Sequence, residues 1–135
     1  MLYALLAWSW MFLLMAFCHV IEDFHVQGIL ADLKQRMWWK DNVKQDGFGH
    51  RYDKDYIAAL LVHGFEWSFF IHLPLMWYTN LSPLVLVSLP INMVVHAVID
   101  DLKCNRLKLN LWQDQLLHLV QIAITASVIL AVYEI

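Results

Sequence analysis

Histidine and aspartate recur along this chain at a spacing of four residues. On a helix, that spacing brings both side chains to one face, about 5–6 Å apart at Cβ. An imidazole and a carboxylate on one turn can then reach the same cation, as two histidines do in helical zinc sites. Three such pairs are present: His19 with Asp23, His96 with Asp100, and Asp114 with His118. The pairs indicate metal binding.

Together with His63, which lies in another apolar segment, the pairs supply four imidazoles and three carboxylates. One tetrahedral zinc ion needs about four ligands, so the set would serve one or two divalent ions, two of them sharing a bridging carboxylate or water. Mixed nitrogen and oxygen ligands favour zinc, with manganese or iron as alternatives. The predicted ligands are His19, Asp23, His63, His96, Asp100, Asp114 and His118.

Side chains near the predicted ligands could act on a substrate, or orient the imidazoles and a bound water. Asp100 and Asp101 are adjacent and point about 100° apart on a helix, so only one should be a ligand. The four-residue spacing from His96 favours Asp100. The predicted general bases are Asp23, Asp114 and Glu66. The residues predicted to orient ligands or to contact substrate are Gln27, Asp101, Lys103 and Gln115.

Membrane-spanning helices should position this set. The chain is 61% hydrophobic and 16% charged, whereas globular domains average about 45–50% and about 25%. The first apolar run is long enough to cross a hydrocarbon core and has no polar face, which excludes a soluble helix. A bulky Phe17 and the lack of a preceding basic residue favour a retained span over a cleaved signal peptide. The predicted spans are 2–21, 57–78, 84–99 and 111–133.

These spans predict an all-α polytopic membrane protein, with four transmembrane helices in a compact bundle that forms a single domain over residues 1–135. Of nine Lys and Arg residues, six lie between the first two spans and three between the last two. Positive charge favours the cytoplasmic side. We therefore expect connections 22–56 and 100–110 in the cytoplasm, both termini outside, and the site facing the cytoplasm at the inner membrane of a bacterium.

The first connection should contain one cytoplasmic interfacial helix. Four apolar residues there follow helical spacing: Val26, Leu30, Leu33 and Met37. Trp38 and Trp39 would lie at headgroup level. The following segment contains Gly47 and Gly49, which predict an exposed loop.

Two alternatives to a metal site stay open. The polar set could be a structural network between helices, although such bonds average only roughly 0.6 kcal/mol and seven ionisable groups exceed that need. It could also be part of an ion or proton path, which should show polar groups through the whole membrane thickness. Against a path, the predicted ligands gather at one depth, and only Glu66 and His72 extend further.

The segments "HVIEDFHVQ", "WWK", "LLVHGFEWS", "HAVIDDLK" and "DQLLHLVQ" occur in that order. In them the chain resembles a family of small integral membrane proteins from bacteria and their phages, catalogued as the domain of unknown function DUF3307. The resemblance implies a compact polytopic protein and brings no established activity. More loosely, inward-facing His and Asp residues on four helices are similar to those of bacterial membrane-bound metal-dependent hydrolases.

The leading hypothesis is a membrane-embedded metal-dependent hydrolase that acts on a lipid or lipid-linked phosphoester at the cytoplasmic leaflet. A bound metal lowers the pKa of water from 15.7 to about 7 and so supplies a nucleophile at neutral pH. The alternatives are a cation or proton transporter, and a non-catalytic phage or host membrane factor. Membrane lipid is the expected partner, nucleic acid is not expected, and the sequence leaves the oligomeric state open.

Overall fold

The computed structural model describes residues 2–43 and 52–133. Helices are the only regular secondary structure within these ranges, and four of them are long and apolar enough to cross a membrane. The predicted all-α membrane protein with four spanning helices is therefore confirmed. The four helices are α1 (Leu2–Ile21), α4 (Asp55–Thr79), α5 (Pro83–Cys104) and α6 (Leu111–Val132).

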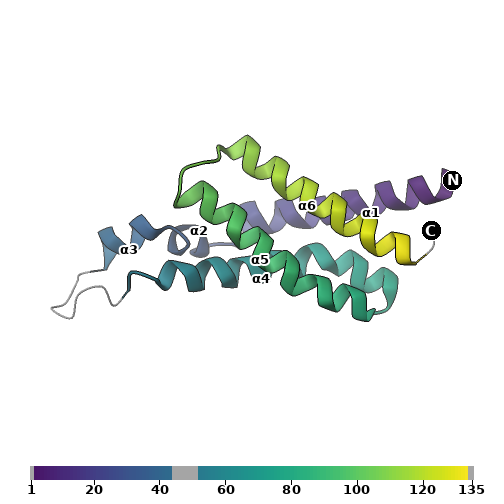
Figure 1. Ribbon diagram of the computed structural model, residues 1–135, viewed down its shortest axis with the longest axis horizontal. Coiled ribbons are helices and arrows are strands. Elements are labelled where there is room, and N and C mark those ends of the chain that lie inside the picture. Colours follow the sequence, from purple (N-terminus) through teal and green to yellow (C-terminus); the bar gives the residue numbers. More distant parts are fainter. Residues whose placement is uncertain (1, 44–51, 134–135) are drawn as a thin grey trace.

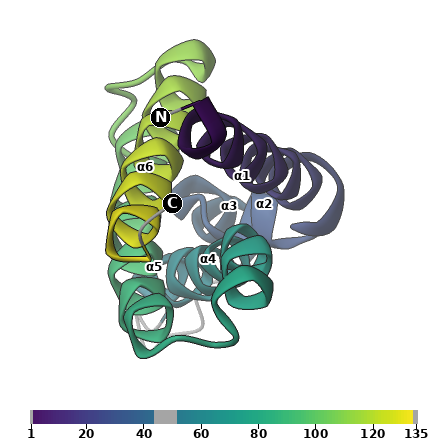
Figure 2. The ribbon, with the colours of Figure 1, turned by 90° about the vertical axis from the view of Figure 1, so that its right-hand side faces the viewer.

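The long helices form a ring in which α4 and α6 each pack against both α1 and α5 (Figure 2). The start of α1, the end of α6 and the α4–α5 turn lie at one end of the bundle (Figure 1). Residues 22–43, which follow α1, and the connection from α5 to α6 lie at the other end. We call this second end the basic end, because all Lys and Arg residues of the described ranges are found there.

Local sequence signals fix where the helices begin. Ser82 Oγ accepts a hydrogen bond from the Leu84 backbone N–H, and Pro83 occupies the first turn of α5. At the start of α6, the Asn110 and Gln113 side chains each accept a hydrogen bond from the other's backbone N–H. These caps fix the first residues of α5 and α6.

The first connection departs from the predicted single helix. It contains a π-helix, η1 (Glu22–Val26), which continues α1, and two short helices, α2 (Leu30–Leu33) and α3 (Arg36–Asn42). Gly28 has a left-handed φ of 50° and Gln35 is extended, so one helix cannot run through both. The predicted loop with Gly47 and Gly49, and the basic residues Lys44 and Arg51, lie outside the described residues.

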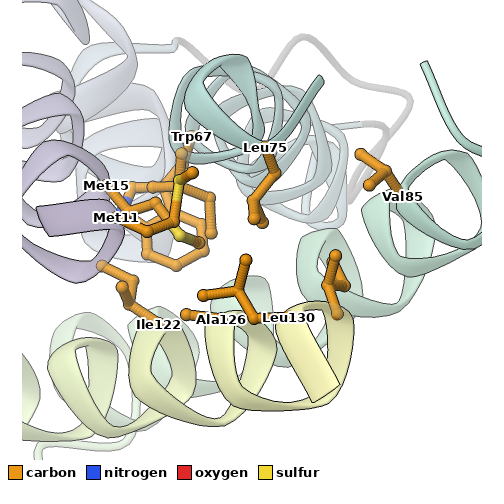
Figure 3. Packing of buried hydrophobic residues seen from close by; sticks show 10 residues of the cluster. Met11, Met15, Trp67, Leu75, Val85, Ile122, Ala126 and Leu130 are labelled. Carbon is orange, nitrogen blue, oxygen red and sulfur yellow. The ribbon is translucent and has the colours of Figure 1, made fainter. Parts of the chain in front are cut away.

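An apolar core fills the half of the bundle away from the basic end. Figure 3 shows Met11 and Met15 of α1 packed against Trp67 of α4, with Ile122 of α6 below them. The remaining core residues are Ile71, Leu75, Val85, Ala126, Ile129 and Leu130. Large apolar side chains also cover the outside of all four long helices, which is the surface that lipid requires.

Gly64 brings α4 against α5. A Cβ at this position would lie 2.7 Å from the Met93 carbonyl oxygen, a distance at which one backbone must move. We expect Gly64→Ala to lower the unfolding free energy by roughly 1–3 kcal/mol, although alanine normally favours a helix. Unfolding in mixed micelles would measure this, with Ala58→Val on the exposed face of α4 as control. Unchanged stability in both variants would show that the helices can separate freely.

Candidate metal centre

Seven buried acidic and imidazole side chains meet in the half of the bundle nearer the basic end. α1 with η1, α4, α5 and α6 all contribute to them, as the sequence predicted. Each has at most 7% of its surface exposed. We call this cluster the carboxylate–imidazole centre; it consists of Glu22, Asp23, His63, His96, Asp100, Asp114 and His118.

The π-helix η1 brings two adjacent acids into the centre. Glu22 and Asp23 are both buried, and the Gln27 backbone N–H donates to the Glu22 carbonyl oxygen five residues earlier. The Gln27 side-chain amide also donates to the Asp23 carbonyl oxygen. Single π-turns of this kind occur frequently at functional sites.

Three of these residues, which we call the first triad, surround a point that a cation could occupy. Nε2 of His63 lies 3.1 Å from Nε2 of His96 and 3.6 Å from Oδ1 of Asp23. The three ligand atoms lie within 4.8 Å of one another. Ligands of a tetrahedral zinc ion are about 3.3 Å apart, as follows from a Zn–N distance of about 2.0–2.1 Å. The first triad is therefore close to the size that a metal site needs.

Asp100 lies between the first triad and a second one. Its Oδ2 is 3.3 Å from Nε2 of His63 and 3.8 Å from Nε2 of His96, where a fourth ligand would stand. Its Oδ1 is 3.3 Å from Nε2 of His118. His96, Asp100 and His118 form the second triad, again with ligand atoms within 4.8 Å. The chain thus offers two adjacent positions for a cation.

His96 belongs to both triads, and this limits how many ions can bind. Its Nε2 faces His63 and its Nδ1 lies 3.1 Å from Nδ1 of His118. A neutral imidazole has one unprotonated nitrogen, so it can ligate one ion at a time. The geometry therefore favours a single ion over the pair that the number of ligands would allow.

The charges of the centre also correspond to one divalent ion. Four carboxylates are buried there, and two of them are paired with lysines: Lys34 Nζ lies 2.5 Å from Asp100 Oδ2, and Lys103 Nζ lies 2.6 Å from Asp114 Oδ2. With neutral imidazoles, two formal negative charges remain. Each uncompensated buried charge costs several kcal/mol, and one divalent cation would balance both.

Unsatisfied polar atoms are concentrated in the same place. Buried polar atoms normally have a hydrogen-bond partner, so each exception calls for a bound ion or water. Eight side-chain atoms of the described residues make no hydrogen bond of standard geometry; six of them are in the centre, and four of these six form two ion-pair contacts of 3.2 and 3.5 Å with each other. These six are Glu22 Oε1 and Oε2, Asp23 Oδ1, His63 Nδ1, Asp114 Oδ1 and His118 Nε2. This donor set therefore fits a cation with nitrogen and oxygen ligands.

Lys34 carries its charge into the centre. Burial by itself would lower the pKa of its ammonium group, but the adjacent Asp100 carboxylate outweighs burial and raises that pKa above the ordinary value. The group is therefore charged at neutral pH. Lys103, which was predicted to meet an anionic substrate group, is more exposed than Lys34. Its ammonium group is paired with the Asp114 carboxylate.

His19 is one of the two predicted ligands that lie outside both triads. Its Nδ1 accepts a hydrogen bond of 2.8 Å from the Trp67 indole N–H, and its Nε2 donates to Gln115 Oε1 at 3.1 Å. With both nitrogens engaged, His19 positions its neighbours. Asp114 is also outside the triads, with Oδ1 3.5 Å from His118 Nε2.

The other predicted residues surround the centre at different distances. Gln115 donates to Asp114, and more weakly to Asp23 at 3.5 Å, as expected of an orienting residue. Asp101 turns away from the centre and binds the Arg106 guanidinium at 2.7 Å. Glu66 is half-buried and makes no polar contact with the centre in the described part of the chain.

Sequence reasoning missed three contributors to the centre: Glu22, Lys34 and Trp67. Glu22 Oε1 lies 3.2 Å from His63 Nδ1, and the three-residue spacing from His19 could have indicated it. The fully buried Trp67 stacks on the His96 ring at a centroid distance of 4.1 Å. Its spacing of four residues from His63 was a usable signal, whereas nothing local indicated Lys34.

Polar groups also extend beyond the centre, contrary to the prediction that only Glu66 and His72 do so. A buried hydrogen-bonded network continues along α4, α5 and α6 toward the other end of the bundle. Its members are Ser68, His72, Ser88, Asn92, Gln121 and Thr125. Several of these side chains donate to backbone carbonyls near Pro90, which lies inside α5 and has no backbone N–H to donate.

Comparison with known proteins finds no matching family model, no similar curated protein and no similar solved structure. The resemblance seen in the sequence motifs therefore stays a prediction. What the centre can do chemically follows from its own residues: two buried His/Asp triads that could hold a metal ion, inside a bundle of membrane-spanning length.

Proposed function

We propose that this membrane protein binds one divalent transition-metal ion and uses it as a hydrolase of a lipid or lipid-linked phosphoester. The observation that carries the proposal is the shared position of His96 in two buried His/Asp triads. Zinc suits this set best, with manganese or iron as alternatives. The first triad and Asp100 would hold the ion, and a catalytic ion would also have to bind a water or a substrate oxygen beside them.

The remaining residues of the centre suit proton transfer. A bound divalent cation supplies a water of pKa about 7 as nucleophile. His118 is not part of the first triad, and its Nε2 lies between Asp100 Oδ1 and Asp114 Oδ1. These two carboxylates orient the His118 ring, which is thereby placed to exchange a proton with the reacting water.

A lipid-like substrate is supported by the surroundings of the centre. The basic end carries exposed apolar side chains on η1, just before α2, and on α3; these are Phe24, Val26, Ile29 and Met37. Such side chains, next to lysines and arginines, suit the interface between acyl chains and headgroups. We propose that this end faces the cytoplasm, as the distribution of basic residues indicates.

The test combines metal analysis with an activity screen. The full chain, purified in mild detergent, should contain one equivalent of transition metal and should release phosphate or alcohol from a phosphoester of a lipid. Asp23→Asn should weaken metal binding, because the ion would have to move to the second triad, and Asp114→Asn should keep the metal but slow hydrolysis at least tenfold. Asp32→Asn on the exposed part of α2 is the control. Full metal loading without any phosphoester hydrolysis would refute the hydrolase.

A cation or proton conduit is the second candidate, and the buried network beyond the centre favours it. Trp67 lies between the centre and this network, because its ring stacks on His96 and packs in the apolar core. In liposomes, a conduit would carry zinc or protons, and Asn92→Leu would stop the flux by removing the network's central amide. Hydrolysis by a chain that carries no flux would exclude this candidate.

A further inference from the structure

Hydrogen bonds from Asn105 hold the backbone at Lys34 and so place its side chain in the centre; we call this contact the clamp. Asn105, at the end of α5, donates from its side-chain amide to the Lys34 carbonyl oxygen at 3.0 Å. The carbonyl of the same amide accepts a hydrogen bond of 2.7 Å from the Arg36 backbone N–H. Asp101 accepts from the Asn105 amide and so fixes its orientation. Asn105 thus holds the backbone on both sides of Gln35, at Lys34 and at Arg36.

The clamp places the ammonium on one particular atom. Lys34 Nζ lies 2.5 Å from Asp100 Oδ2, the oxygen that stands 3.3 Å from His63 Nε2. That oxygen is the fourth ligand position beside the first triad. The ammonium therefore neutralises a carboxylate that lies against imidazoles of both triads and that a bound cation would also contact.

An ammonium and a divalent cation cannot both stand against this oxygen without strong repulsion, because they would be separated by only a few ångström in a buried site. The Lys34 side chain is 13% exposed, and its four-carbon stem can turn toward the basic end without moving the clamped backbone. Once displaced, its ammonium would stand beside the bound ion with no carboxylate of its own.

We propose that Lys34 is an internal counter-ion that changes partners: it holds Asp100 in the metal-free protein and binds the phosphate group of an anionic ligand after a divalent cation has taken Asp100. The second half rests on the proposed function. The class of ligand follows from the charge, since a phosphate can bridge an ammonium and a metal ion. Lys34 is thus a specificity-determining residue for anionic ligands.

The test is a zinc titration of the full chain in mild detergent against a competing chelator, with and without inorganic phosphate. Lys34→Gln should bind zinc roughly tenfold or more tightly in the absence of phosphate, because the competing charge is gone. Phosphate should tighten zinc binding by the wild type and do so much less in Lys34→Gln, since the two ligands are coupled through this residue. Lys34→Arg should retain the competition, and Lys40→Gln, on the exposed side of α3, is the matched control. Asn105→Ala, which loosens the clamp without changing charge, should give an intermediate affinity.

Two results would overturn the proposal. Zinc binding by Lys34→Gln that is unchanged or weaker would show that Lys34 supports the site instead of competing for it. An equal effect of phosphate on wild type and variant would show that the metal alone holds the anion.

The metal-free half is tested separately. Lys34→Gln should lower the midpoint of thermal unfolding in the presence of chelator, because Asp100 then loses its counter-ion, and adding Asp100→Asn should restore it. If the wild type binds no zinc, the proposed function fails and the phosphate half fails with it. The thermal unfolding data would then test only whether Lys34 is the counter-ion of Asp100. An unchanged midpoint in Lys34→Gln would refute that role.

Discussion

Replacing His96 by alanine is expected to abolish metal binding altogether. This imidazole is the one residue common to both triads. Without it, the first triad keeps His63 as its one imidazole, beside the carboxylates of Asp23 and Asp100, and the second keeps only His118 and Asp100. We expect one imidazole with carboxylates, one of them already paired with Lys34, to hold a transition metal too weakly for it to survive purification. Elemental mass spectrometry of the purified chain should find one equivalent of metal in the wild type and none in His96→Ala.

The neighbouring histidines provide the controls for this experiment. His118→Ala leaves the first triad whole and should keep one equivalent. His63→Ala should move the ion to the second triad and weaken binding without ending it. His25→Ala changes an exposed histidine and should have no effect. Two equivalents in the wild type, or full loading of His96→Ala, would contradict a single ion bound through a shared imidazole.

The helices and their polar faces could be predicted because each depends on local pattern. Residues 2–21 carry no charge, and lipid leaves such a segment few choices other than a helix. The four-residue spacing of His96 and Asp100 places both on one side of α5 wherever that helix packs. Exposing these groups to lipid is costly, so the four polar faces had to meet.

The sequence could not predict which partner each imidazole nitrogen and carboxylate oxygen of the centre has, because the partners come from residues far away in the sequence. His19 has the same spacing to Asp23 as His96 has to Asp100, yet its nitrogens are taken by Trp67 and Gln115 from other helices. Glu22 enters the centre through a π-turn, which has no α-helical periodicity to reveal it. Lys34 arrives through a clamp from α5.

Trp67 connects the apolar core to the polar centre, and Trp67→Ala should be the most destabilising single change. The side chain is fully buried, stacks on His96 and donates to His19 Nδ1. Its removal opens a cavity, which for a buried tryptophan costs about 3–5 kcal/mol. It also leaves the His19 nitrogen without its donor, at a further cost of about 1–3 kcal/mol. Losses of this size approach the whole stability of a typical domain.

Unfolding of the purified chain in mixed micelles would measure this effect, and a metal titration on the same samples would follow the centre. Trp67→Phe should recover much of the packing but not the hydrogen bond to His19, so its stability should lie between the other two. Trp77→Ala is the matched control, since Trp77 is 88% exposed on the outside of α4 and should cost little. If Trp67→Ala unfolded no more easily than Trp77→Ala, Trp67 would not stabilise both the apolar core and the centre. In that case His96 would be held by its polar neighbours alone, and the metal site would tolerate a change in the core beside it.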